Sequence, residues 1–144
     1  MPSKKKMSLV RQFKAEYRAR IEYERRMLYL QNKLIELDNQ FEAHSPMLGG
    51  ERVQSNKTHD QRLAEYTVKR ARIAEELDVL EAQARKVDRI TEQMNPELLR
   101  HFENITRGKY TQETAADYMG ISRMKFRDRL DDDILKAHNK ALNK

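Results

Sequence analysis

Cysteine is absent from this sequence, and glycine and proline are scarce, with four and three residues among 144. Without cysteine, the chain can form neither a disulfide framework nor a metal site with thiolate ligands. Long apolar runs are also missing. None approaches the roughly 18 to 20 residues that a membrane-spanning helix needs, and no apolar signal region follows the first lysines. We therefore expect a soluble, cytoplasmic protein with no membrane partner.

Patterns typical of catalysis or metal binding are missing too. The chain has no glycine-rich phosphate-binding loop, no nucleophile elbow and no paired carboxylates. Its four histidines lack ligand spacing, and we expect them to be exposed. Asp131, Asp132 and Asp133 are consecutive, but neighbours on a helix point about 100° apart and cannot converge on one ion. Repulsion of phosphate, or pairing with Arg129 and Lys136, fits them better. We predict no enzymatic activity, cofactor or metal.

The residues that are present favour long helices exposed to water. Only 38% are hydrophobic and 36% are charged, and the mean hydropathy is −0.97, so we expect no single globular core built from the whole chain. Such charge density with so few glycines is typical of long exposed helices. The sequence therefore predicts an all-α protein.

Positive charge gathers in two places within a net charge of +6. Residues 1–26 hold nine Lys or Arg against three Glu, and residues 96–144 hold ten against eight Asp or Glu. Both regions could approach phosphates, although the lysines at 4–6 could equally serve only solubility. We predict that residues 1–8 are a disordered basic tail.

Residues 9–95 carry two stretches of heptad spacing separated by a loop at 43–60. Upstream of residue 23 the apolar residues are spaced by four instead, which predicts that packing loosens or changes partner there. Arg70 is the polar exception in the second stretch and could fix its register. These patterns predict a long antiparallel helical hairpin, a coiled coil, that associates with further copies; whether it closes within one chain stays open. The two seams consist of Tyr23, Met27, Leu30, Leu34, Leu37 and Phe41, then of Leu63, Tyr66, Ile73, Leu77, Leu80, Ala84 and Val87.

A small trihelical domain is predicted for residues 96–144. Proline disfavours the helical conformation for the residue before it, so Asn95-Pro96 marks the boundary. Helices are expected at 97–107, 112–119 and 122–142, with Thr111 as the cap of the second.

The spacing from Gln112 to Leu130 is that of a helix-turn-helix. Ala116 keeps the first helix thin, Gly120 lies at the bend, and Ser122 can cap the second helix. A plain antiparallel helix pair is the alternative. The second helix, however, carries four cations and one acidic residue, Asp128, up to Leu130, and this excess of positive charge favours DNA binding. We predict that double-stranded DNA is bound by Thr111, Gln112, Ser122, Arg123, Lys125 and Arg127.

This layout resembles the small late-gene transcriptional activators of bacteriophages of Gram-positive bacteria, the RinA/ArpU-like group. The likeness covers nearly the full chain: its length, the coiled N-terminal region, the stretch GGERVQSN at 49–56, and a C-terminal motif similar to region 4 of bacterial sigma factors. The resemblance implies promoter binding upstream of packaging and structural genes, in the cytoplasm of the host bacterium.

Three functions are compatible with the sequence. The favoured one is a sequence-specific transcriptional regulator, an oligomeric activator that holds RNA polymerase near a promoter. The second is the DNA-recognition subunit of a phage packaging machine, since small terminase subunits also join such a motif to coiled helices. The third is a coiled-coil adaptor whose C-terminal helices bind protein.

Overall fold

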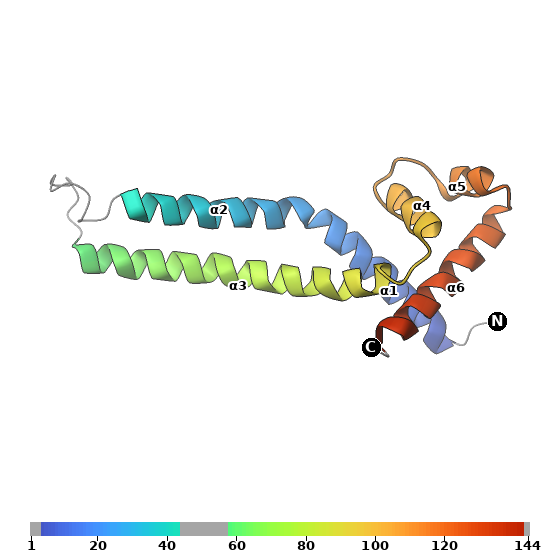
Figure 1. Cartoon of the computed structure of the whole chain (residues 1–144), viewed down its shortest axis with the longest axis horizontal. Helices are drawn as coiled ribbons and strands as arrows, with labels where there is room; N and C mark the ends of the chain where they lie inside the picture. The colour runs from blue at the N-terminus through green and yellow to red at the C-terminus, as the bar shows by residue number, and fades with distance from the viewer. Residues whose placement is uncertain (1–3, 44–57, 143–144) are drawn as a thin grey trace. The chain divides into compact units, whose positions relative to one another are not determined.

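The computed structural model describes residues 4–43 and 58–142, and within them it contains six helices and no strand (Figure 1). The prediction of an all-α protein is confirmed. The loop residues 44–57, with the GGERVQSN stretch, lie outside the described residues. None of the helices described is both long and apolar enough to cross a membrane. The helices are α1 (Lys4–Glu22), α2 (Glu24–Ala43), α3 (His59–Thr91), α4 (Pro96–Thr106), α5 (Gln112–Met119) and α6 (Arg123–Leu142).

The helices form two units. One, called here the terminal unit, comprises Met1–Glu22 and Gln83–Lys144; the other, the central unit, comprises Tyr23–Ala82. Helix α3 contributes to both. This division differs from the predicted boundary at Asn95-Pro96, because α1 and the last turns of α3 share a core with the C-terminal helices.

The N-terminal segment also differs from its prediction as a disordered tail at 1–8. Helix α1 begins at Lys4, so residues 4–8 are helical and only residues 1–3 lie outside the described part. The helix ends at Glu22, and a turn at Tyr23 separates it from α2. The break lies where the apolar spacing changes from four residues to heptads. The change of spacing thus marks a change of packing partner.

The core of the terminal unit joins α1, the end of α3, α4, α5 and α6. Phe126, Leu130 and Ile134 place one side of α6 in this core. Phe13 of α1 is also buried, and its ring lies 6.2 Å from that of Phe102 in α4, centroid to centroid. Burying aromatic rings of this size contributes several kcal/mol of stability. Helix α1 is therefore an integral part of this unit.

Helix α4 begins at the predicted boundary, Asn95-Pro96. Asn95 caps α4, its side-chain oxygen accepting from the N–H of Glu97 at 2.9 Å and of Leu98 at 3.2 Å. Pro96 occupies the first helical position, where its missing N–H costs nothing. The three helices at 96–106, 112–119 and 123–142 agree with the predicted ranges to within one residue.

The central unit pairs α2 with the first part of α3. Arg26, near the start of α2, forms an ion pair with Glu76 at 2.8 Å, and Phe41, near its end, stacks on Tyr66 at 4.2 Å. Partners later in α2 are thus earlier in α3, so the two segments run in opposite directions. Among the apolar residues described here, only Leu30 and Leu77 are buried in this unit.

Polar pairs also join α2 and α3. Asp38 accepts a hydrogen bond from the Tyr66 hydroxyl and pairs with Nε of Arg70 at 3.2 Å. The Tyr66 hydroxyl, and to a smaller extent Arg70, holds the pKa of the Asp38 carboxyl below its ordinary value. Arg70, the polar exception in the predicted seam, thus has a partner on the facing helix.

Candidate nucleic-acid interface

Helix α5 begins with the cap predicted at Thr111. The Thr111 hydroxyl accepts a hydrogen bond from the N–H of Thr114 at 3.3 Å, and Gln112 is the first helical residue. Thr111 is exposed and Gln112 is half-buried. The backbone N–H groups of the first turn carry partial positive charge, as at any helix start. The beginning of α5 can therefore approach an anion, which is the role that the sequence predicts for both residues.

The turn between α5 and α6 closes both helix ends. Gly120 adopts φ 70° and ψ 29°, the left-handed conformation that favours glycine. The N–H of Ile121 bonds the carbonyl of Ala116 at 3.0 Å, and the N–H of Gly120 bonds that of Asp117 at 3.1 Å, the pattern of a Schellman motif. Ser122 then caps α6, its hydroxyl accepting from the N–H of Lys125 at 3.1 Å. The predicted bend and cap are confirmed.

Small side chains allow α5 and α6 to approach closely. Ala115 and Ala116 are both buried, and they belong to the same core as Phe126 and Leu130 of α6. Leu130 is buried in this core, whereas its neighbour Arg129 is exposed. The orientation of α6 is thereby fixed: residues 126 and 130 point inward.

The basic side chains of α6 point into solvent. Arg123, Lys125, Arg127 and Arg129 are all exposed. Within residues 4–43 and 58–142, none of the four has a carboxylate within ion-pair distance. Pairing with acids one turn away would stabilise such a helix by only about 0.2–0.5 kcal/mol per pair. Unpaired cations on a rigid helix are suited to bind an anion supplied from outside.

These cations do not all lie on one side of α6. Arg123 and Arg127 are one turn apart and share a side, whereas Lys125 lies about 200° round the axis from Arg123, at roughly 100° per residue. Met124, which the sequence analysis did not select, lies between them and is 66% exposed. The sequence does show that Met124 is an apolar residue in the first turn of this helix and lies outside the predicted core positions. Thr111 and Gln112 belong to the start of α5, and no hydrogen bond joins them to the α6 cations among the described residues.

Two of the three consecutive aspartates have structural partners that the sequence did not predict. Asp131 forms an ion pair with Lys14 of α1 at 2.7 Å, and Asp133 accepts a hydrogen bond from the N–H of Asn95 at 2.8 Å. Pairing with Arg129 or Lys136 was expected instead, and the structure shows neither. No group of three or more potential ligands for a metal ion occurs in the described part of the chain. These aspartates hold α6 against α1 and the start of α4.

His101 corrects the expectation that the histidines are exposed. It is buried, its Nδ1 is hydrogen-bonded to the Tyr110 hydroxyl, and Asn104 donates to the same hydroxyl at 3.2 Å. The His101 ring meets Phe126 edge-on, with centroids 6.1 Å apart. His101 therefore supports the α4–α5 connection from behind α6 and is not part of the basic surface.

Arg123, Lys125, Arg127 and Arg129 are thus exposed cations, on more than one side of a helix that is capped and packed against its neighbours. Exposed guanidinium and ammonium groups of this kind can bind anionic oxygens. Comparison with models of protein families, with curated proteins and with solved structures finds no match for the chain.

Proposed function

We propose that the protein is a sequence-specific regulator of transcription that binds double-stranded DNA, with α5, the Gly120 turn and α6 acting as a helix-turn-helix. The observation that carries the proposal is the set of unpaired, exposed cations in the first two turns of α6. Because the inner side of α6 is packed into a core, its backbone holds the outward side chains in fixed positions relative to the rest of the unit. Such fixed presentation is what a recognition helix requires.

DNA recognition would divide between two kinds of contact. Ser122 and the helix start at Thr111 and Gln112 would meet phosphate oxygens and set the register, with no information about sequence. Arg123, Lys125 and Arg127 would reach base edges in the major groove, where arginine pairs preferentially with guanine. Each good base contact contributes roughly 1–3 kcal/mol of discrimination.

Self-association would double the limited specificity of one such motif. The central unit supports this part of the proposal, because its α2–α3 pair leaves Leu28, Ile35, Val68 and Val79 at least half exposed. Two helices with so small a core gain stability from a further copy, as in an antiparallel coiled-coil hairpin that dimerises. Two motifs would then bind two half-sites at a separation that the assembly sets.

Activation of phage late genes is the regulatory role that we propose. Its support is the resemblance of the sequence to the RinA/ArpU-like activators. An activator of this kind would hold RNA polymerase near the promoter in the cytoplasm of the host bacterium.

The test is selection of bound duplexes from a genomic fragment library by the full-length protein, followed by affinity measurement with the best fragment. We expect one enriched sequence. Arg123→Ala with Arg127→Ala should weaken binding to it by about 2–6 kcal/mol, at ~1–3 kcal/mol per contact. The charge-matched control is Arg85→Ala with Arg89→Ala, two exposed arginines on α3.

Three outcomes would count against this function. Equal losses in both double variants would mean that α6 does not read sequence. A ring of many subunits that stimulates a packaging ATPase would favour the terminase alternative. Absence of any sequence preference, with capture of a protein partner by the C-terminal helices, would favour an adaptor.

A further inference from the structure

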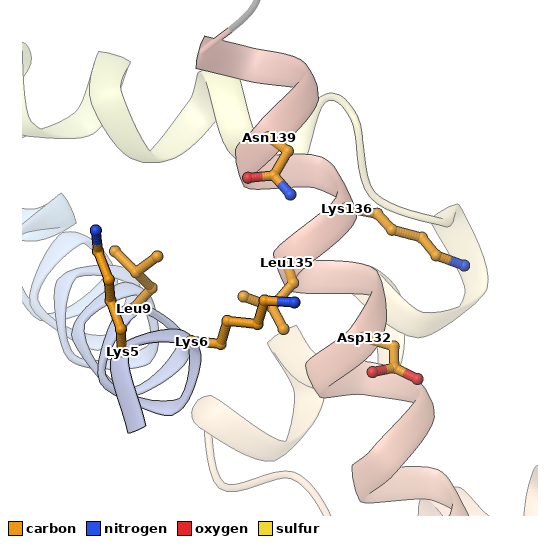
Figure 2. A pocket seen from close by; sticks show the side chains of 7 residues that line it. All are labelled: Lys5, Lys6, Leu9, Asp132, Leu135, Lys136 and Asn139. Carbon is orange, nitrogen blue, oxygen red and sulfur yellow. The ribbon is translucent and has the colours of Figure 1, made fainter. Parts of the chain in front are cut away.

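A groove between α1 and α6 opens beside the proposed recognition surface. It has two adjoining parts, with volumes of about 430 Å³ and 350 Å³, which share Lys6, Asp132 and Leu135. Figure 2 shows the first part, where Lys6 reaches from α1 toward Leu135 of α6. Both helices belong to the terminal unit, so the groove is formed within one core. Residues 5–14 of α1 therefore lie across the groove from residues 127–139 of α6.

Arg11 of α1 and Arg127 of α6 are both in the lining of the second part of the groove. Both line it, both are exposed, and neither has a carboxylate partner in the described part of the chain. Two guanidinium groups facing one groove repel each other unless an anion lies between them or close by. The planar guanidinium fork matches the oxygens of a phosphate.

The acidic groups of the groove do not cancel this charge. Asp131 is taken by Lys14 at 2.7 Å. Asp128 and Asp132 also line the groove and would repel phosphate locally. Across both parts, three aspartates face six cations: Lys5, Lys6, Arg11, Lys14, Arg127 and Lys136. The surplus is positive, and the pair at 11 and 127 lies at the end nearest the start of α6.

We propose that Arg11 binds a backbone phosphate of the same duplex that α6 enters, so that α1 acts as a second DNA-contacting helix. The inference rests on the proposed function of α6. A groove that begins at Arg127 places α1 directly beside any strand that Arg127 contacts. Arg11 then adds affinity and fixes the position of the terminal unit on the backbone, while sequence is read by α6 alone.

The experiment measures binding of the full-length protein to the selected duplex and to an unrelated duplex over a series of potassium chloride concentrations. The variant is Arg11→Gln, and the control is Arg18→Gln, an exposed arginine on the same helix that lines neither part of the groove. Each phosphate contact changes the slope of log K against log salt by about 0.9. We expect Arg11→Gln to flatten the slope by about that amount. It should weaken binding to both duplexes by the same factor. Arg18→Gln should keep the wild-type slope.

Each alternative result is decisive. If Arg11→Gln keeps the wild-type slope while the wild-type protein binds its selected site, the inference is wrong and the proposed function stands. If Arg11→Gln weakens the selected duplex only, Arg11 reads bases and the phosphate role is wrong. If the wild-type protein binds neither duplex, both the inference and the proposed function fail.

Discussion

The terminal and central units solve the problem of helix packing in different ways. In the terminal unit, fourteen buried residues form one core, thirteen of them from five helices and Met94 from the connection between α3 and α4. In the described part of the central unit, Leu30 and Leu77 are the buried apolar residues. Other residues of the predicted seams, such as Leu37 and Ile73, are half-buried, and polar pairs also join the two long helices. Convergence of several helices is needed for a core that holds a helix rigidly. The first unit therefore holds its exposed side chains on a rigid core, whereas the second leaves most of its described apolar side chains partly exposed.

The two units also use the same charged residue types differently. In the central unit, Arg26 pairs with Glu76 and Arg70 pairs with Asp38, and both ion pairs join α2 to α3. On α6, Arg123 and Arg127 have no such partner among the described residues. The α6 arginines are therefore available to an anion, whereas those of the α2–α3 contact are already paired.

Removal of residues 1–22 should have the largest effect on this contrast. The deletion takes Val10, Phe13 and Tyr17 out of the core, and losing each large buried side chain costs roughly 2–5 kcal/mol. Their sum is comparable to the whole stability of a small domain, about 5–15 kcal/mol. We expect the cooperative thermal transition of the terminal unit to disappear from circular dichroism melts. An unchanged transition would show that residues 83–144 fold without α1.

Phe126→Ala should produce the next largest effect. The Phe126 side chain is fully buried, and removing such a ring costs about 3–5 kcal/mol. Met124→Ala on the same helix is the control, since an exposed site away from special features usually changes stability by less than about 0.5 kcal/mol. Urea denaturation measures both variants. Equal, small losses would contradict the orientation of α6 described above.

Gly120→Ala should cost less, roughly 1–2 kcal/mol, because an alanine at φ 70° brings its Cβ against its own backbone. No other heavy atom lies within 4 Å of that Cβ position, so the penalty is purely conformational. Asparagine tolerates this conformation better, and Gly120→Asn should lose less stability in the same denaturation assay. If Gly120→Asn were as damaging as Gly120→Ala, crowding and not backbone strain would be the cause.

Tyr66→Phe should give the smallest effect, confined to the central unit. The Tyr66 hydroxyl lowers the pKa of the Asp38 carboxyl, so this contact stabilises the fold above the unfolded pKa of Asp38 and is lost as pH falls through the folded value. In the variant, the Asp38 pKa should move up toward its ordinary value, with less weakening between neutral and acidic pH. NMR titration of the carboxyl checks this. An unshifted pKa would mean that Arg70 alone sets it.

Much of the terminal unit was predictable because its signals are local. Asn95, Thr111, Gly120 and Ser122 fix helix ends through hydrogen bonds to residues no more than four or five positions away, and sequence spacing records such contacts. The outward cations of α6 followed from the same spacing. The ends of these helices could therefore be predicted from the sequence.

Contacts between distant segments were not predictable in the same way. The packing of Phe13 against Phe102, and of Lys14 against Asp131, depends on how α1 meets α4 and α6 in space. The spacing by four in α1 revealed an apolar side but not which helices it faces. His101 was misjudged for the same reason, because its partner Tyr110 lies beyond the end of α4.

Hydrogen–deuterium exchange of the full-length protein, with and without its selected duplex, tests the central claim most directly. The account predicts that DNA slows exchange at the starts of α5 and α6, at residues 111–114 and 122–127, and leaves α2 and residues 59–82 of α3 unchanged. Protection confined to the central unit, with α6 exchanging at its unbound rate, would contradict the claim that α6 is the helix that meets DNA.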